Sequence, residues 1–135
     1  MTKKKIVRFD TLYQKEIIWL QWYFKRDKTC PKNTILQQMI IERRLEVGDN
    51  QDTILAKYTA IQKALDAIVQ KTDEDVLRTI KEVYVYRSMN IIGACNEIMH
   101  LSETPVYIRL RKWFKEFSDE VFNPEYYKEQ LHERN

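Results

Sequence analysis

The sequence predicts a nearly all-α fold. Only two Gly and three Pro occur in 135 residues, so sheet-rich folds, which need frequent tight turns, are poorly supported. Strong helix formers fill most of the remaining positions. With 44% hydrophobic and 32% charged residues, the chain has the size and balance of one soluble domain or two small lobes, which excludes a large multidomain enzyme.

The first nine residues carry four cations and no acid, and they are most simply read as a solvated arm that could also touch phosphate. A helix over about 11–26 is expected next, with Asp10 or Thr11 as its N-cap. Its apolar residues recur at the spacing of one helix face, at Tyr13, Ile17, Leu20 and Phe24. Residues 27–33 are read as a break, because Pro31 disfavours helix for the residue before it.

Asn33 or Thr34 is expected to cap a second helix that runs to about Leu45. Gly48 signals a stop, and Asp52 can cap the helix that follows. That helix repeats apolar residues over two heptads, at Ile54, Tyr58, Ile61, Leu65 and Ile68. Such a seam needs a partner helix. The partner is either another helix of this chain, since two heptads are too few for a freestanding coiled coil, or a second copy in a homo-oligomer.

Thr72 and Asp75 resemble a capping box that opens a helix over about 73–88. Asn90 is then expected to cap a short helix that ends near Met99.

Ser102 is expected to cap the last long helix, which runs to about Val121. The segment after it adds one more helix or lies loose. These elements divide the chain into an N-terminal helical region (1–70), a second helical module (71–122) and a C-terminal tail (123–135).

A helix, a short helix, a turn and a long helix have the outline of a helix-turn-helix. A close helix crossing needs small residues, and Gly93, Ala94 and Cys95 provide them. If Cys95 is the small residue at the crossing, the turn holds one residue more than usual. If Asn96 takes that place, the spacing fits but a polar side chain enters a tight contact.

The last helix should bury one stripe, formed by Val106, Leu110, Trp113, Phe114, Phe117 and Val121. The opposite face would meet DNA, since the N-terminal residues of a recognition helix reach base edges while later cations hold phosphates. The candidate DNA-binding residues are Arg87, Ser102, Glu103, Thr104, Tyr107, Ile108, Arg111, Lys112 and Lys115. Among them, Thr104, Tyr107 and Ile108 would read bases, whereas Arg87, Arg111, Lys112 and Lys115 would contact phosphates. Glu103 is unusual there, because phosphate repels a carboxylate that does not accept from a cytosine amino group.

Residues 73–122 resemble the sigma-factor region-four helix-turn-helix found in small phage late transcription regulators of the RinA and ArpU type. The likeness lies in the Met-Thr-Lys-Lys-Lys start, Val83-Tyr84-Val85-Tyr86, Ala94-Cys95-Asn96-Glu97-Ile98 and His100-Leu101-Ser102. The resemblance implies an activator of phage packaging, structural and lysis genes. We therefore expect a sequence-specific regulator that binds double-stranded DNA and recruits RNA polymerase. Residues 71–122 would form its helix-turn-helix DNA-binding module, and residues 1–70 would serve oligomerisation or polymerase contact. A protein inhibitor is a further candidate partner.

The alternative is a helical protein-interaction module that does not bind DNA, such as an anti-activator or a phage assembly factor. It would use the same seam and aromatic surface for a partner protein. An enzyme is not expected, because no histidine is positioned to activate Cys95. The tryptophans Trp19, Trp22 and Trp113 could stack on bases, but aromatic residues at helical spacing more often belong to the core.

Neither a cofactor nor a metal is expected. Gly48 and Gly93 stand too far apart for a glycine-rich phosphate loop, and the cysteines and histidines lack metal-site spacing. Two cysteines without a close partner suit a reducing cytoplasm. The net charge of +3 does not by itself argue for nucleic acid.

No apolar run approaches the roughly 20 residues that span a bilayer, and the N-terminus has no signal-peptide pattern. The sequence therefore predicts a protein that stays inside the cell that makes it and has no membrane partner. The resemblance implies that this is the cytoplasm of a bacterial host.

Overall fold

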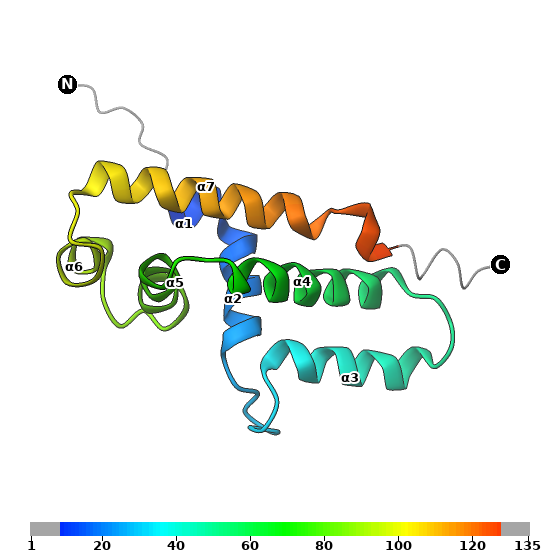
Figure 1. Cartoon of the computed structure of the whole chain (residues 1–135). Helices are drawn as coiled ribbons and strands as arrows, with labels where there is room; N and C mark the ends of the chain where they lie inside the picture. Colours follow the sequence, from blue (N-terminus) through cyan, green and yellow to red (C-terminus); the bar gives the residue numbers. More distant parts are fainter. Residues whose placement is uncertain (1–8, 128–135) are drawn as a thin grey trace.

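The computed structural model describes residues 9–127, which form an all-α fold (Figure 1). Its helices are α1 (Phe9–Leu12), α2 (Gln14–Phe24), α3 (Ile35–Val47), α4 (Thr53–Gln70), α5 (Glu74–Ile80), α6 (Ile91–Ala94) and α7 (Glu103–Val121). Two π-helical turns, η1 (Lys81–Val85) and η2 (Cys95–Met99), extend α5 and α6, and a 3₁₀ turn, η3 (Pro124–Tyr127), follows α7. The predicted all-α class is confirmed over these residues. Of the solvated arm predicted over residues 1–9, residues 1–8 lie outside the described residues, and so does the tail beyond residue 127.

The predicted first helix starts earlier than expected and is interrupted. Phe9 is buried, and its ring packs on those of Tyr107 and Phe114, so the chain is already held in the core at that point. Asp10 lies inside α1 rather than capping it, and Tyr13 separates α1 from α2. The prediction of a single helix with an Asp10 or Thr11 cap is therefore wrong.

The N-caps predicted for α3 and α4 are confirmed. Thr34 forms a capping box with Gln37, in which each side chain accepts a hydrogen bond from the backbone N–H of the other. At the start of α4, the Asp52 carboxylate accepts from the N–H of Leu55 at 2.8 Å. Gly48 ends α3 with a φ of 60°, a conformation that glycine adopts without the steric cost of a Cβ.

The apolar seam of α4 is filled by the chain's own helices. α4 packs on both α3 and α7, and in Figure 1 it lies between them. Ile61 and Leu65 have no exposed surface and Ile68 is buried, so these three cannot contact a second copy unless the core opens. The intramolecular alternative therefore holds for them. Tyr58 is half-buried against the Trp22 ring, whereas Ile54 is exposed.

The two regions predicted at 1–70 and 71–122 share one core. Among the described residues, the buried side chains form a continuous cluster that runs from Phe9 to Val121. Trp19 of α2, for example, packs edge-to-face on Phe117 of α7, with 6.0 Å between the ring centroids. The predicted boundary coincides with the end of α4, but the hydrophobic packing crosses it.

The start of α5 differs from the prediction. Asp73 is its N-cap, accepting a hydrogen bond from the N–H of Asp75, so the capping box assigned to Thr72 is wrong. The Thr72 hydroxyl is already engaged, since it donates to the carbonyl of Ile68 and accepts from the indole N–H of Trp113. The predicted helix over 73–88 ends as the π turn η1, which stops at Val85.

Candidate nucleic-acid interface

The segment before α7 contains one residue more than a regular α-helix would hold. Asn90 caps α6 as predicted, with its side chain accepting from the N–H of Gly93 at 2.8 Å. The chain then widens into η2, where the N–H of His100 donates to the carbonyl of Cys95, five residues earlier. A π turn has i→i+5 bonds and so accommodates an additional residue.

This π turn decides between the two readings of the helix crossing. Cys95 is buried, as is Ala94, whereas Asn96 is exposed, so Cys95 rather than Asn96 faces the core. The extra residue is accommodated within η2. Burial, followed by the nearby Glu103 carboxylate, raises the pKa of the Cys95 thiol, so the neutral thiol is favoured over a thiolate.

Ser102 lies at the N-cap of α7, as predicted, but its hydroxyl makes no capping hydrogen bond. That part of the prediction is wrong. The turn that precedes it, from His100 to Ser102, is instead held by a backbone bond from the N–H of Leu101 to the carbonyl of Cys95 at 3.2 Å.

The two faces of α7 are arranged as the periodicity predicts. The six apolar residues of its stripe are all buried. On the opposite side, the outer face of α7 exposes Thr104, Ile108, Arg111, Lys112 and Lys115. Lys115 pairs with Asp119 at 3.0 Å. Within residues 9–127, neither Arg111 nor Lys112 makes an ion pair, so both charges face solvent.

One flank of α7 borders a groove of about 910 Å³. Six candidate residues line it, namely Arg87, Glu103, Thr104, Tyr107, Ile108 and Arg111. Its wall includes Phe9, whose ring centroid lies 5.6 Å from that of Tyr107, so Tyr107 is a half-buried wall residue rather than a fully exposed one. Burial raises the pKa of Tyr84, a further lining residue, and its phenol remains protonated at neutral pH.

Arg87 does not point freely into this groove. Its guanidinium donates to the Asp10 carboxylate at 3.1 Å, and both side chains remain about half exposed. Glu103 also lines the groove. The cations Arg87 and Arg111 are therefore balanced by two carboxylates on this flank.

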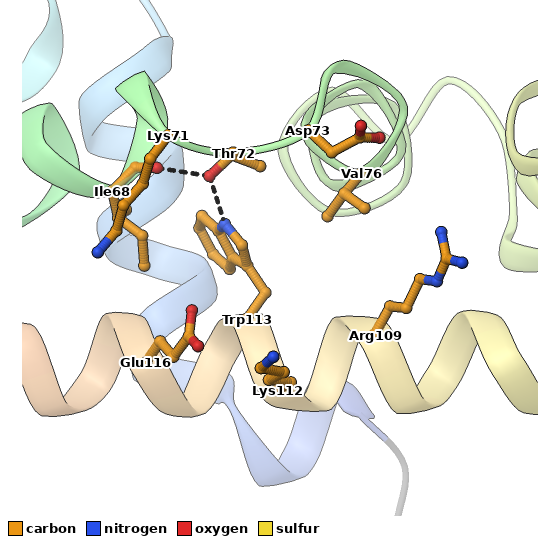
Figure 2. A pocket seen from close by; sticks show the side chains of 9 residues that line it. All are labelled: Ile68, Lys71, Thr72, Asp73, Val76, Arg109, Lys112, Trp113 and Glu116. Atoms are coloured by element: carbon orange, nitrogen blue, oxygen red, sulfur yellow. Dashed lines mark hydrogen bonds between the residues drawn. The ribbon is translucent and has the colours of Figure 1, made fainter.

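The other flank of α7 borders a hollow of about 490 Å³, shown in Figure 2. Two exposed cations that the sequence reasoning did not select, Lys71 at the end of α4 and Arg109 on α7, line it together with Lys112. Arg109 could have been selected, because residues 103–115 contain four cations and a single acid. Lys71 could not, since its proximity depends on how α4 packs against α7.

Within residues 9–127, no group of His, Cys, Asp and Glu side chains is arranged to hold a metal ion. In the same range, no helix combines the length and the apolar character needed to cross a membrane. Comparisons with protein-family models, with curated proteins and with solved structures found no match.

Proposed function

We propose that this chain is a sequence-specific DNA-binding regulator whose recognition helix is α7. The observation that carries the proposal is the outer face of α7, where Arg111 and Lys112 are exposed and make no ion pair within the described residues. Thr104 and Ile108 lie on the same face toward the N-terminal end of the helix. This order, with small polar and apolar groups first and cations after them, is the one that a major-groove helix uses.

The contacts follow from helix dimensions. An α-helix with its side chains is about 10–12 Å across, and the major groove is about 12 Å wide. Thr104 can hydrogen-bond a base edge, and Ile108 can pack on a thymine methyl group. Arg111, Lys112 and Lys115 then reach phosphates, and Arg87 can do so by exchanging Asp10 for the DNA backbone.

The biological role proposed is that of a phage or prophage activator of late genes, of the RinA and ArpU type, acting in the bacterial cytoplasm. In this role α7 holds promoter DNA while the N-terminal helices contact RNA polymerase. The exposed pair Ile41 and Leu45 supports a protein contact by the N-terminal helices. The two residues lie four apart on α3 and are 43% and 81% exposed. Neighbouring apolar side chains left on the surface are available for a protein contact.

The test is fluorescence anisotropy with two labelled duplexes at several salt concentrations. One duplex carries the DNA upstream of the operon that flanks the coding sequence, and the other is a shuffled duplex of equal length and composition. Arg111→Ala and Lys112→Ala should weaken binding to both duplexes and reduce the salt slope by about 0.9 each. Ile108→Ala should instead reduce the preference for the upstream duplex, by roughly fivefold.

Arg44→Ala is the matched control, because Arg44 is an exposed cation on α3, away from α7. Its salt slope should equal that of the unmodified protein. The absence of a salt-sensitive complex with either duplex would refute DNA binding.

The second candidate function is a protein-interaction module, an anti-activator or an assembly factor, and the exposed Ile41 and Leu45 also favour it. Under this alternative the protein binds neither duplex, and Leu45→Lys disrupts a complex with a partner protein.

A further inference from the structure

The chain enters the described fold at a fixed point beside α7. Phe9 is 8% exposed, and its ring packs on the rings of Tyr84, Tyr107 and Phe114, with centroid distances of 5.9, 5.6 and 5.5 Å. Tyr107 and Phe114 both belong to α7. The segment that precedes Phe9 is therefore attached to the molecule at this side of α7.

The attachment point lies on the groove flank of the proposed recognition helix. Phe9 lines the groove of about 910 Å³ together with Thr104, Ile108 and Arg111, which are three residues of the outer face of α7. In Figure 1, α1 lies against α7, as the contact between Phe9 and Phe114 requires. Residues 1–8 thus join the fold next to the surface on which DNA would lie.

The groove flank has no surplus of positive charge of its own. Its two cations, Arg87 and Arg111, are matched by the carboxylates of Asp10 and Glu103, and Asp10 pairs with Arg87 at 3.1 Å. A helix in the major groove lies between two sugar-phosphate backbones, so the backbone on this flank also attracts cations. The described residues of the groove do not supply an excess of them.

The first eight residues contain the cations that this flank lacks. Lys3, Lys4, Lys5 and Arg8 are positive, and no acidic residue precedes α1. In extended form, the six residues from Lys3 to the start of α1 span up to about 20 Å. This length exceeds the diameter of a helix with its side chains, which is about 10–12 Å. All four cations are therefore within reach of phosphates that lie beyond the edge of α7.

We propose that residues 1–8 are a basic arm that binds the phosphates of the DNA backbone on the groove flank of α7. This inference rests on the proposed function and extends its interface to a segment that the function does not use. Phe9 is the anchor of the arm. Because its ring is fixed on α7, the arm is held near any duplex that α7 contacts, and its cations meet the phosphates at a high effective concentration.

The first test compares two double variants that remove the same charge. Lys3→Ala/Lys4→Ala takes two cations from the arm. Lys28→Ala/Lys32→Ala takes two exposed cations from the loop at the end of α2 that is farther from α1 (Figure 1). Binding to the shuffled duplex is measured at several salt concentrations. The arm variant should reduce the slope of log K against log salt by up to about 1.8, the value for two phosphate contacts, and the loop variant should leave it unchanged.

The outcomes separate the arm from the proposed function. An unchanged slope in the arm variant, with duplex binding intact, would overturn the inference and leave the proposed function standing. Equal reductions in both variants would also overturn it, because they indicate attraction to the net charge of the protein rather than an arm on the duplex. If the unmodified protein binds neither duplex, the proposed function fails and the inference fails with it.

The second test measures proximity and does not depend on the charge of the arm. A DNA-cleaving iron chelate is attached to the cysteine of Thr2→Cys, in a chain that also carries Cys30→Ser, since Cys30 is partly exposed and Cys95 is buried. The control carries the chelate at Lys28→Cys. With the shuffled duplex bound, the chelate at position 2 should cleave it and the control should not. Equal cleavage by both proteins would overturn the arm, although the duplex complex would still support the proposed function.

Discussion

Within residues 9–127, two residues that carry a Cβ adopt the left-handed backbone conformation, each after a π turn. Arg87 has a φ of 56° and follows η1 by two residues, and His100 has a φ of 55° and directly follows η2. For an L-residue this conformation costs about 1–2 kcal/mol, and glycine is the usual solution at helix ends. Since both positions lie at the ends of the helices next to the proposed interface, backbone strain is concentrated there.

His100→Gly should stabilise the protein. Glycine removes the steric cost at φ 55° but adds freedom to the unfolded chain, so we expect a net gain of up to about 1 kcal/mol in the free energy of unfolding. His100→Val should lower this free energy by about 1 kcal/mol, because a β-branched residue is especially unfavourable at positive φ. Urea denaturation of both variants checks this, and a stabilising His100→Val would contradict it.

At the scale of helices, the junction between α3 and α4 is held by a charge pair. The guanidinium of Arg43 donates to both carboxylate oxygens of Asp52, each at 2.8 Å, while Asp52 also caps α4. The hydrogen bonds from Arg43, followed by the one from the Leu55 N–H, lower the pKa of Asp52 from 3.8 to about 2. The carboxylate is 15% exposed, so solvent screens the pair incompletely.

Because the pKa of Asp52 is lowered in the folded state, the free energy of unfolding should fall at acidic pH. The unfolded state binds the proton more readily, so the contribution of Asp52 is complete above pH 3.8 and is lost as the pH falls through about 2. Asp52→Asn keeps a capping oxygen but removes the charge. We expect this variant to be less stable at neutral pH and to lose less stability between these two pH values.

The measurement is urea denaturation at pH values on either side of this window. Asp49→Asn, in the loop before α4, is the control and should behave like the unmodified protein. Parallel pH curves for Asp52→Asn and the unmodified protein would disprove the assignment.

Three of the N-caps could be predicted from the sequence. The N-caps predicted at Thr34, Asp52 and Asn90 are confirmed. In each case the side-chain oxygen accepts a hydrogen bond from a backbone N–H of the first helical turn. The capping box predicted at Thr72 is wrong, because the Thr72 hydroxyl instead accepts a hydrogen bond from the indole N–H of Trp113 on α7. The π turns have no predictable signal, since i→i+5 bonding depends on packing rather than on residue type. For the same reason, the positive φ of His100 has no signal in the sequence.

At the scale of the whole molecule, one core joins the N-terminal helices to α7. Leu65 of α4 and Phe114 of α7 are both fully buried in it. The buried stripe and the exposed outer face of α7 could be predicted from helical periodicity alone. In the structure the stripe is buried and the outer face is exposed. The flanks of α7 were not predictable in the same way, because Lys71 and Phe9 reach them only through the tertiary fold.

A shared core predicts cooperative unfolding of the described residues. Tryptophan fluorescence and far-ultraviolet circular dichroism should give coincident urea transitions. Leu65→Ala should lower the free energy of unfolding by about 2–5 kcal/mol and move both transitions together. Leu45→Ala is the matched control, since this leucine is 81% exposed, and it should change the free energy by less than about 0.5 kcal/mol. Two separate transitions, with the N-terminal helices melting first, would contradict a shared core.

The π turn η2 has a consequence for how this protein can vary. Because η2 spans Cys95–Met99 with one residue beyond an α-helical turn, losing the exposed Asn96 would convert it into ordinary helix. The buried ends of the turn would stay in place, and so would the direction in which α7 leaves it. Homologues that differ in length by one residue at this point could therefore present the same side chains to a partner.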